Sequence, residues 1–221
     1  MERRDAPQSA VEMKVNLPNQ ITIGRLGLAI VFIAVLAQFS AAERPPRYWL
    51  LDVSAVLFII ASLSDIADGY LARKHNQVTS FGRVIDPFVD KVLVCGAFIL
   101  FVGAGFVKDG ANVTDVAPWM AVLILCRELF VTGIRGFSEA KGESFAATVY
   151  GKAKMVLQSV TAAWILFTVA HPEGLLGQPF FVNGRKVLVW ATVIGTALSM
   201  IAYLGMARTI LAETSRPAEK A

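Results

Sequence analysis

The stretch from Trp49 to Val107 contains two long apolar runs, WLLDVSAVLFIIASLSDIADGYLAR (49–73) and VIDPFVDKVLVCGAFILFVGAGFV (84–107). Each run is long enough to cross the roughly 30 Å hydrocarbon core of a bilayer, which takes about 20 mainly apolar residues in a helix. Aspartates interrupt both runs where the runs approach each other in sequence. The stretch therefore predicts two consecutive membrane helices with an acidic cluster at one shared end.

Four more runs of this kind lie elsewhere in the 221-residue chain, of which 55% is hydrophobic and only 17% charged. Soluble domains carry about 25% charged residues. We therefore expect an all-α integral membrane protein with six transmembrane helices. The predicted spans are 21–39, 49–73, 84–107, 116–135, 153–170 and 187–208. We divide the chain into a polar N-terminal lead (1–18), a six-helix transmembrane domain (19–210) and a polar C-terminal tail (211–221).

The basic residues lie mostly in the connections between the runs, which indicates membrane topology rather than nucleic-acid binding. If the N-terminus is cytoplasmic, sixteen of the 21 Lys and Arg residues fall on the cytoplasmic side and five on the other. Cytoplasmic loops carry such an excess. Both termini and the acidic cluster are thus predicted to be cytoplasmic. Cys95 and Cys126 each lie inside an apolar run, where we expect them to pack between helices.

Four aspartates form the acidic cluster. Asp65 and Asp68 are three residues apart near the end of one predicted helix, and Asp86 and Asp90 are four residues apart near the start of the next. Residues at these spacings share a helix face. Because the two helices are joined by the predicted turn 74–83, the two acidic faces can meet at the membrane edge.

Such a cluster needs neutralisation, because charged side chains within a membrane helix are energetically unfavourable. Oxygen-only ligands suit Mg²⁺ or Mn²⁺. Two such ions about 3.5–4 Å apart can clamp a phosphoryl group during displacement. Small residues on the first acidic face, Gly69 and Ala72, leave room for a ligand. A set of solvated aspartates at helix ends is the alternative interpretation.

The pattern DxxDGxxAR, eight residues, then GxxxDxxxD runs from Asp65 to Asp90. It resembles the signature of the CDP-alcohol phosphatidyltransferases at every fixed position, and the resemblance extends over about residues 17–210. It implies a homodimeric membrane enzyme, expected in the bacterial inner membrane. It also implies two divalent cations held by Asp65, Asp68, Asp86 and Asp90. Asp90 is implied as the general base, and Asp68, Gly69 and Arg73 as contacts of the CDP-linked lipid.

The segment LPNQITIGR (17–25) opens the first predicted span. Asn19 and Thr22 suit the cap of a helix N-terminus, with Arg25 at the membrane interface. The segment also resembles the NxxTxxR element of the same family, which lies near the nucleotide. Asn19 and Thr22 are therefore candidate contacts of the CDP-lipid, and the two interpretations are compatible.

A basic cluster follows in the fourth and fifth spans. RELFVTGIR (127–135) and GKAK (151–154) contribute Arg127, Arg135, Lys152 and Lys154. These residues suit a positive-inside flank or a binding site for an anionic acceptor, since Arg binds phosphate in a bidentate manner. The excess of Lys and Arg on the cytoplasmic side does not explain Glu128. The two segments resemble REFxVxGxR and GKxK of the family branch that uses sn-glycerol 3-phosphate, with Leu129 in place of Phe.

The resemblance implies transfer of the phosphatidyl group from CDP-diacylglycerol to sn-glycerol 3-phosphate. Inositol phosphate, serine or phosphatidylglycerol is an alternative acceptor, although the basic cluster disfavours serine. A divalent-cation transporter is a remote alternative, because transporter sites lie near the bilayer midplane and often between inverted repeats. Here the aspartates lie at one end, and the sequence has no internal repeat.

The predicted topology has a direct test in a background without the native cysteines. The substitutions Asn76→Cys and Lys141→Cys should be labelled by a membrane-impermeant thiol reagent from the cytoplasmic side only. Gly110→Cys should be labelled from the outside only. Labelling from the reverse sides would contradict the placement of the whole acidic cluster.

Overall fold

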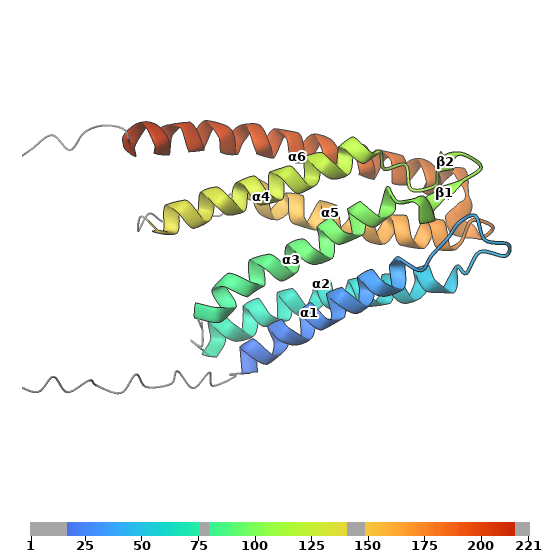
Figure 1. Ribbon diagram of the computed structural model, residues 1–221, viewed down its shortest axis with the longest axis horizontal. Coiled ribbons are helices and arrows are strands. Elements are labelled where there is room, and N and C mark those ends of the chain that lie inside the picture. Colours follow the sequence, from blue (N-terminus) through green and yellow to red (C-terminus); the bar gives the residue numbers. More distant parts are fainter. Residues whose placement is uncertain (1–16, 76–79, 141–148, 215–221) are drawn as a thin grey trace, which may run out of the picture.

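Six helices run side by side along the long axis of the molecule (Figure 1). The computed structural model describes residues 17–75, 80–140 and 149–214. The helices in these ranges are α1 (Leu17–Leu36), α2 (Trp49–His75), α3 (Ser80–Phe101), α4 (Pro118–Ala140), α5 (Val149–Ala170) and α6 (Pro179–Thr214). The helical class is confirmed for this part of the chain, and a short β-hairpin accompanies the helices.

The two ends of the bundle differ. At one end α1 connects to α2, α3 to α4 and α5 to α6, and this end carries β1 (Val107–Lys108) and β2 (Ala111–Asn112), which pair antiparallel (Figure 1). We call it the hairpin end. The last turns of α2 and the first turns of α3 lie at the opposite end, which we call the motif end.

The third predicted span was too long. The prediction extended it to residue 107, whereas α3 ends at Phe101 and the chain then forms a 3₁₀ turn (Ala104–Phe106) and the hairpin. Gly105 packs against the first connection so closely that a β-carbon would overlap the carbonyl oxygen of Phe39. Asp109 and Gly110 turn the hairpin with φ angles of 50° and 80°. Asp-Gly favours this two-residue turn. The hairpin and the close approach of Gly105 therefore end the helix at Phe101, although the apolar sequence continues to Val107.

Other boundaries were also misplaced. The first span was predicted to end at residue 39, but α1 ends at Leu36. The last was predicted as 187–208, but α6 extends from Pro179 to Thr214. Both α4 and α6 begin with proline, whose fixed φ and missing N–H suit the first helical position. Arg185 and Lys186, which precede the predicted span, therefore lie on a helix.

Aromatic side chains hold the hairpin-end half of the bundle together. The Phe32 and Phe58 rings join α1 to α2 with centroids 5.5 Å apart. The Phe106 ring lies 5.1 Å from that of Phe39 and 5.6 Å from that of Phe101, centre to centre, so the 3₁₀ turn is packed onto the first connection and onto α3. Cys95 is buried as expected, whereas Cys126 is exposed on α4, contrary to its predicted packing role.

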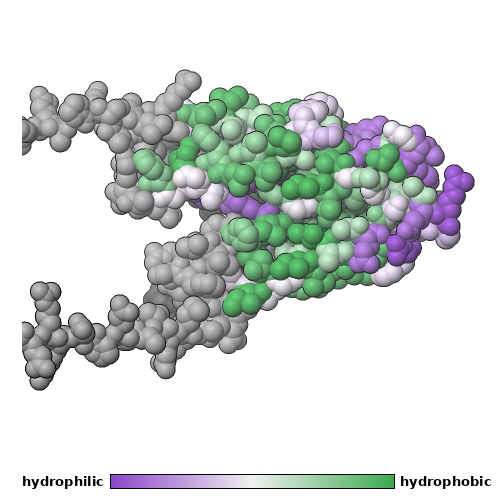
Figure 2. All heavy atoms as spheres, viewed as in Figure 1, coloured by the Kyte–Doolittle hydropathy of each residue, from purple (hydrophilic) through white to green (hydrophobic). Residues whose placement is uncertain are grey.

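The face of the bundle seen in Figure 2 is largely apolar, and hydrophilic residues gather at the hairpin end. Two segments within the described ranges are long and apolar enough to cross a membrane, Ala153–Ala170 in α5 and Pro179–Gly205 in α6. Shorter apolar segments occur in α1 and α2. The apolar surface is compatible with a bilayer, and the crossing of a membrane by all six helices stays a prediction.

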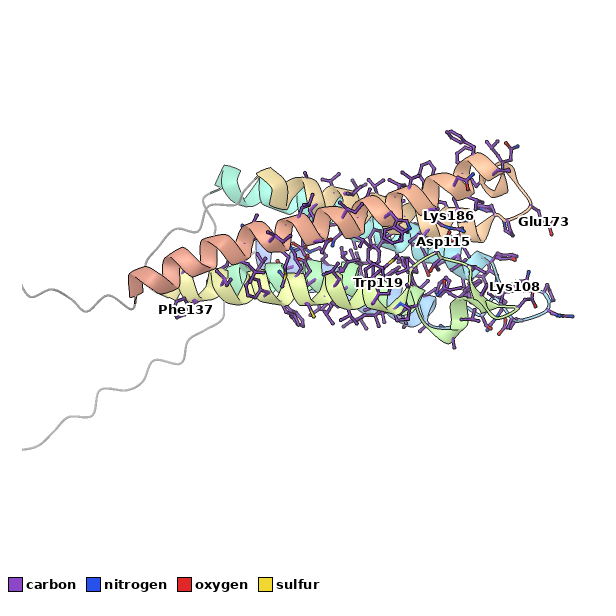
Figure 3. All side chains as sticks on the ribbon, turned by 90° about the horizontal axis from the view of Figure 1, so that it is seen from above. Lys108, Asp115, Trp119, Phe137, Glu173 and Lys186 are labelled. Carbon is purple, nitrogen blue, oxygen red and sulfur yellow. The ribbon has the colours of Figure 1, made fainter. Side chains whose placement is uncertain are left out.

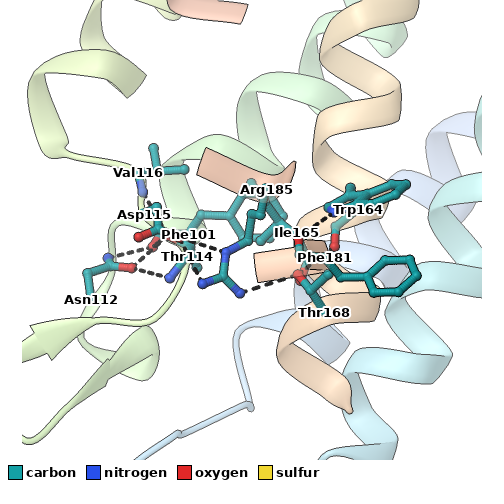
Figure 4. A network of polar contacts seen from close by, with 10 residues as sticks. All are labelled: Phe101, Asn112, Thr114, Asp115, Val116, Trp164, Ile165, Thr168, Phe181 and Arg185. Carbon is teal, nitrogen blue, oxygen red and sulfur yellow. Dashed lines mark hydrogen bonds and ion pairs between the residues drawn. The ribbon is translucent and has the colours of Figure 1, made fainter. Parts of the chain in front are cut away.

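A polar network closes the hairpin end. Arg185 of α6 donates a hydrogen bond from Nε to Oδ2 of Asp115 at 2.8 Å, and its Nη2 forms an ion pair with the same oxygen at 2.8 Å; Asp115 lies in the connection before α4. The Nη1 atom of Arg185 also reaches the Thr168 hydroxyl of α5 at 3.3 Å (Figure 4). The Asn112 amide and the Thr114 hydroxyl both donate to the carbonyl oxygen of Phe101, at 2.8 and 3.0 Å. The network thus joins α3, α5 and α6 through the connection. Asp115 and Lys186 lie close to this end in Figure 3, with Lys108 and Glu173 beyond them.

Removing Arg185 should destabilise the bundle. In Arg185→Gln the Asp115 carboxylate loses its partner, and we expect a cost of about 1–3 kcal/mol, less than for a fully buried pair because Asp115 is 25% exposed. This corresponds to a drop of roughly 2–10 °C in the unfolding midpoint measured in detergent.

The exposed neighbour Lys186 provides a matched control, since Lys186→Gln should leave the midpoint nearly unchanged. Adding Asp115→Asn to Arg185→Gln should cost less than the sum of the single changes. Additive losses would show that the two side chains are not coupled.

Candidate active site

The acidic motif lies on helices, as predicted. Asp65 and Asp68 belong to the last turns of α2, and Asp86 to the first turns of α3. Their side chains, and those of Gly69 and Arg73, lie outside the described part of the structure. The turn between the helices is shorter than predicted, since α2 continues to His75 and α3 begins at Ser80. Both acidic segments therefore lie at the motif end, while the convergence of their carboxylates stays a prediction.

Asp90 is the aspartate of the motif whose side chain the structure describes. It is 27% exposed, and its Oδ1 lies 3.5 Å from Nη1 of Arg25, whose side chain is 2% exposed. Arg25 comes from α1, so this ion pair joins the first helix to the acidic motif. Sequence reasoning assigned Arg25 only to the membrane interface and omitted it from the site. The sequence signal for Arg25 was its position as the last fixed residue of NxxTxxR.

The N-terminal element lies inside a helix and is not its cap. Because α1 begins at Leu17, Asn19 and Thr22 occupy helical positions, and the capping interpretation is wrong. Thr22 is 3% exposed and lies three residues before Arg25, so both side chains share the inward face of α1. The side chain of Asn19 is outside the described part. Thr22 is thus placed on the helix face that contacts Asp90 through Arg25.

Glu128 lies between two buried cations. Its carboxylate forms an ion pair with Lys154 of α5 and lies 3.3 Å from Nη1 of Arg127 on its own helix. Arg127, Glu128 and Lys154 are only 4%, 8% and 3% exposed. The role of Glu128 is now clear, because it offsets the repulsion between the two cations. One carboxylate against two cations leaves a net positive charge inside the bundle.

Helix α6 supplies two contacts that sequence reasoning missed. Arg127 donates to the Ser199 hydroxyl from Nη2 at 2.6 Å and from Nε at 3.2 Å. The Arg127 guanidinium also lies 5.1 Å from the centre of the Tyr203 ring, within the range of a cation–π interaction. Ser199 and Tyr203 are four residues apart in an apolar helix, and that spacing of polar groups was the available signal.

The remaining basic residues extend the cluster toward the motif end. Arg135 lies two turns beyond Arg127 on α4, is partly buried, and its Nε has no hydrogen-bond partner among the described residues. Lys91, next to Asp90 on α3, lies within electrostatic reach of Arg127 and Arg135. The structure thus brings the Asp90 region of α3 close to the basic cluster of α4. The side chain of Lys152 is outside the described part.

This arrangement suits the binding of an anion with several oxygens. Buried cations are stable only when they are paired. Guanidinium and ammonium groups from α4 and α5 exceed the single carboxylate between them, and a phosphate would supply the missing negative charge through charge-assisted hydrogen bonds.

The acidic motif offers a complementary donor set. Four carboxylates without nitrogen or sulfur ligands fit Mg²⁺ or Mn²⁺. In the ranges whose side chains are described, no group of three potential metal ligands occurs, since only Asp90 of the motif falls within them.

Comparisons with known proteins agree with this chemistry. Residues 15–201 match the family model of the CDP-alcohol phosphatidyltransferase family. A protein of Bacillus subtilis (strain 168), named CDP-diacylglycerol–glycerol-3-phosphate 3-phosphatidyltransferase, is 38% identical over 185 residues, which cover 81% of this chain and 90% of the relative.

Proteins with the same name show similar likeness in two other bacteria. The Cereibacter sphaeroides protein is 37% identical over 172 residues, or 75% of this chain and 71% of its own. The Rickettsia typhi (strain Wilmington) protein is 31% identical over 194 residues, or 88% of this chain and 98% of its own. With the family match spanning most of its length and including both the acidic motif and the basic cluster, the chain belongs to the CDP-alcohol phosphatidyltransferase family.

Proposed function

We propose that this protein transfers the phosphatidyl group of CDP-diacylglycerol to sn-glycerol 3-phosphate, giving phosphatidylglycerophosphate and CMP. The observation that carries the proposal is the buried cluster of Arg127, Glu128 and Lys154, which has excess positive charge and lies near Asp90 of the family motif. The relatives described above carry the name of this activity.

The acidic motif is assigned to the CDP-lipid and its metal ions. Asp65, Asp68, Asp86 and Asp90 would hold two divalent cations, Mg²⁺ or Mn²⁺. Bound there, the ions would neutralise the diphosphate of the substrate. Asp68 would also contact the CDP-lipid. The other assigned contacts of this substrate are Asn19, Thr22, Gly69 and Arg73.

The transfer needs a base for the acceptor hydroxyl. The hydroxyl oxygen attacks the phosphorus next to the diacylglycerol, the bond from that phosphorus to the CMP oxygen breaks, and CMP leaves. Asp90 accepts the hydroxyl proton. Arg25, buried on α1 and 3.5 Å from Asp90, holds that carboxylate in place. Arg25 is thus a positioning residue for the proposed base.

The acceptor phosphate is assigned to Arg127, Arg135, Lys152 and Lys154. Arg127 is fixed from α6 by Ser199 and Tyr203, so little conformational freedom remains to be lost on binding. An acceptor without a phosphate, such as serine, would leave this cluster uncompensated. Inositol phosphate would satisfy it equally well, and the name shared by the relatives is what favours sn-glycerol 3-phosphate.

The surroundings of the site complete the proposal. The apolar surface seen in Figure 2 suits six membrane crossings. The motif end and both termini would lie in the cytoplasm of a bacterial cell. The transmembrane domain would extend from about residue 19 to about residue 210. A homodimer is proposed from the family resemblance. The transporter alternative loses its support, because the chain belongs to a family of phosphatidyltransferases.

The acidic motif should be essential for turnover. Asp65→Ala, Asp68→Ala and Asp86→Ala should each abolish activity, and chelation should abolish that of the wild type. Asp90→Asn should keep part of the CDP-diacylglycerol binding but lose turnover, because the proton acceptor is gone. Purified variants would be measured for both CMP release and nucleotide binding.

Glu173, exposed near the hairpin end, provides the control, since Glu173→Gln should retain full activity. Substantial turnover by Asp90→Asn would remove Asp90 from the role of base.

The choice of acceptor is tested with purified protein, CDP-diacylglycerol and radiolabelled sn-glycerol 3-phosphate, inositol phosphate, serine and phosphatidylglycerol. We expect turnover with the first. Arg135→Ala or Lys154→Ala should raise its KM roughly 10- to 100-fold, since a charge-assisted hydrogen bond contributes about 1.5–3 kcal/mol and 1.4 kcal/mol is tenfold. The KM for CDP-diacylglycerol should change much less.

Lys108→Ala, at the hairpin end, should change neither KM. Equal losses for both substrates in the Arg135 and Lys154 variants would contradict the assignment of the cluster to the acceptor. Turnover with inositol phosphate alone would keep the family chemistry and overturn the proposed acceptor.

A further inference from the structure

Two neutral polar side chains buried next to the basic cluster each have an atom that lacks a hydrogen-bond partner among the described residues. Gln158 of α5 is 2% exposed and Thr196 of α6 is fully buried. Within the described ranges, neither the Gln158 Nε2 atom nor the Thr196 Oγ1 atom has a partner. Buried polar atoms are almost always paired in native proteins, by protein, water or ligand. Two such atoms on neighbouring helices therefore need an explanation.

The register of α5 and α6 places these groups at one level. The helices are antiparallel and pack side by side (Figure 1). The hydroxyls of Thr161 and Thr192 meet at 2.8 Å and fix the register. Stepping one turn along both helices toward the motif end brings Gln158 level with Thr196. A second turn brings Lys154 level with Ser199, in agreement with the contacts of both residues to the Arg127–Glu128 pair.

The backbone positions of Gln158 and Thr196 thus lie one turn, about 5 Å, from those of Lys154 and Ser199, on the side of the hairpin end. The next turn is already closed, because the Thr161 hydroxyl pairs with Thr192 and with the carbonyl oxygen of Leu157 at 2.8 Å. The two unpaired groups therefore form the last polar level beside the cluster. Farther toward the hairpin end, the hydroxyls of Thr161, Thr192 and Thr168 all have hydrogen-bond partners.

The proposed acceptor has one group left to match them. Its phosphate is assigned to the cations and its terminal hydroxyl reacts near Asp90, which leaves the secondary hydroxyl. A hydroxyl is both donor and acceptor, the Gln158 Nε2 is a donor, and the Thr196 hydroxyl can accept. Resting on the proposed function, we infer that Gln158 and Thr196 bind the secondary hydroxyl of the phosphorylated acceptor and determine specificity for it.

The test compares two acceptors in one reaction. 3-Hydroxypropyl phosphate keeps the phosphate and the terminal hydroxyl of sn-glycerol 3-phosphate but lacks the secondary hydroxyl. Wild-type enzyme is given CDP-diacylglycerol with both acceptors, and the two lipid products are counted by mass spectrometry. The product ratio gives the ratio of kcat/KM values and is independent of the amount of folded enzyme.

We expect the wild type to prefer sn-glycerol 3-phosphate, because a site built to bind a hydroxyl rejects an analogue that lacks it. Gln158→Leu and Thr196→Val should each reduce this preference roughly tenfold or more, through loss of turnover with sn-glycerol 3-phosphate. Thr196→Ser keeps the hydroxyl and should keep the preference. Thr161→Val, one turn away and already paired, should slow both acceptors equally if it slows either.

An unchanged ratio in Gln158→Leu and Thr196→Val, with both acceptors slowed together, would overturn the inference and assign the two residues to packing. Wild-type enzyme that uses neither acceptor but transfers to another alcohol would overturn the proposed function, and this inference with it. The wild-type reaction thus separates the two failures.

Discussion

Charges buried inside an otherwise apolar bundle must be compensated where they lie, and the ion pairs around Glu128 bring one carboxylate to two buried cations. Glu128 holds Lys154 of α5 and Arg127 of α4 together, and Arg127 is fixed in turn by Ser199 of α6. Three helices are thereby joined by groups that water does not reach. Their relative positions follow from the need to bring both buried cations to the one carboxylate, since an unpaired buried charge is strongly destabilising.

The constraint acts twice along the bundle. At the hairpin end, Arg185 of α6 is paired with Asp115 and Thr168, and this network ties the connection before α4 to α5 and α6. Near the motif end, the Glu128 cluster repeats the arrangement with an important difference. The first network is closed by its own carboxylate, whereas the second has more cations than carboxylates and retains positive charge. Stability and anion binding are thus assigned to opposite ends of the same helices.

A similar division separates the two substrates. The acidic motif on α2 and α3 belongs to the CDP-lipid in the proposal, and the basic cluster on α4 and α5 belongs to the acceptor phosphate. The two meet at Asp90 and Lys91, neighbours on α3. Asp90 pairs with Arg25 of α1, and Lys91 lies within electrostatic reach of Arg127 and Arg135 of α4. The reacting oxygen and phosphorus would therefore approach each other at the boundary between an acidic and a basic half of the site.

The helical class, the order of the six helices and the two motifs follow from the sequence, because helices satisfy their backbone hydrogen bonds locally and a motif at i, i+3 or i+4 needs one helix only. Sequence reasoning misjudged the ends of α1, α3 and α6, where glycine, proline and a close contact with Phe39 decide the boundary. Tertiary structure alone revealed the partners of the charges. Ser199 lies 72 residues from Arg127, and Arg185 lies 70 residues from Asp115. Such pairs depend on how distant helices pack and on the cost of burying a charge alone, and no local pattern encodes either.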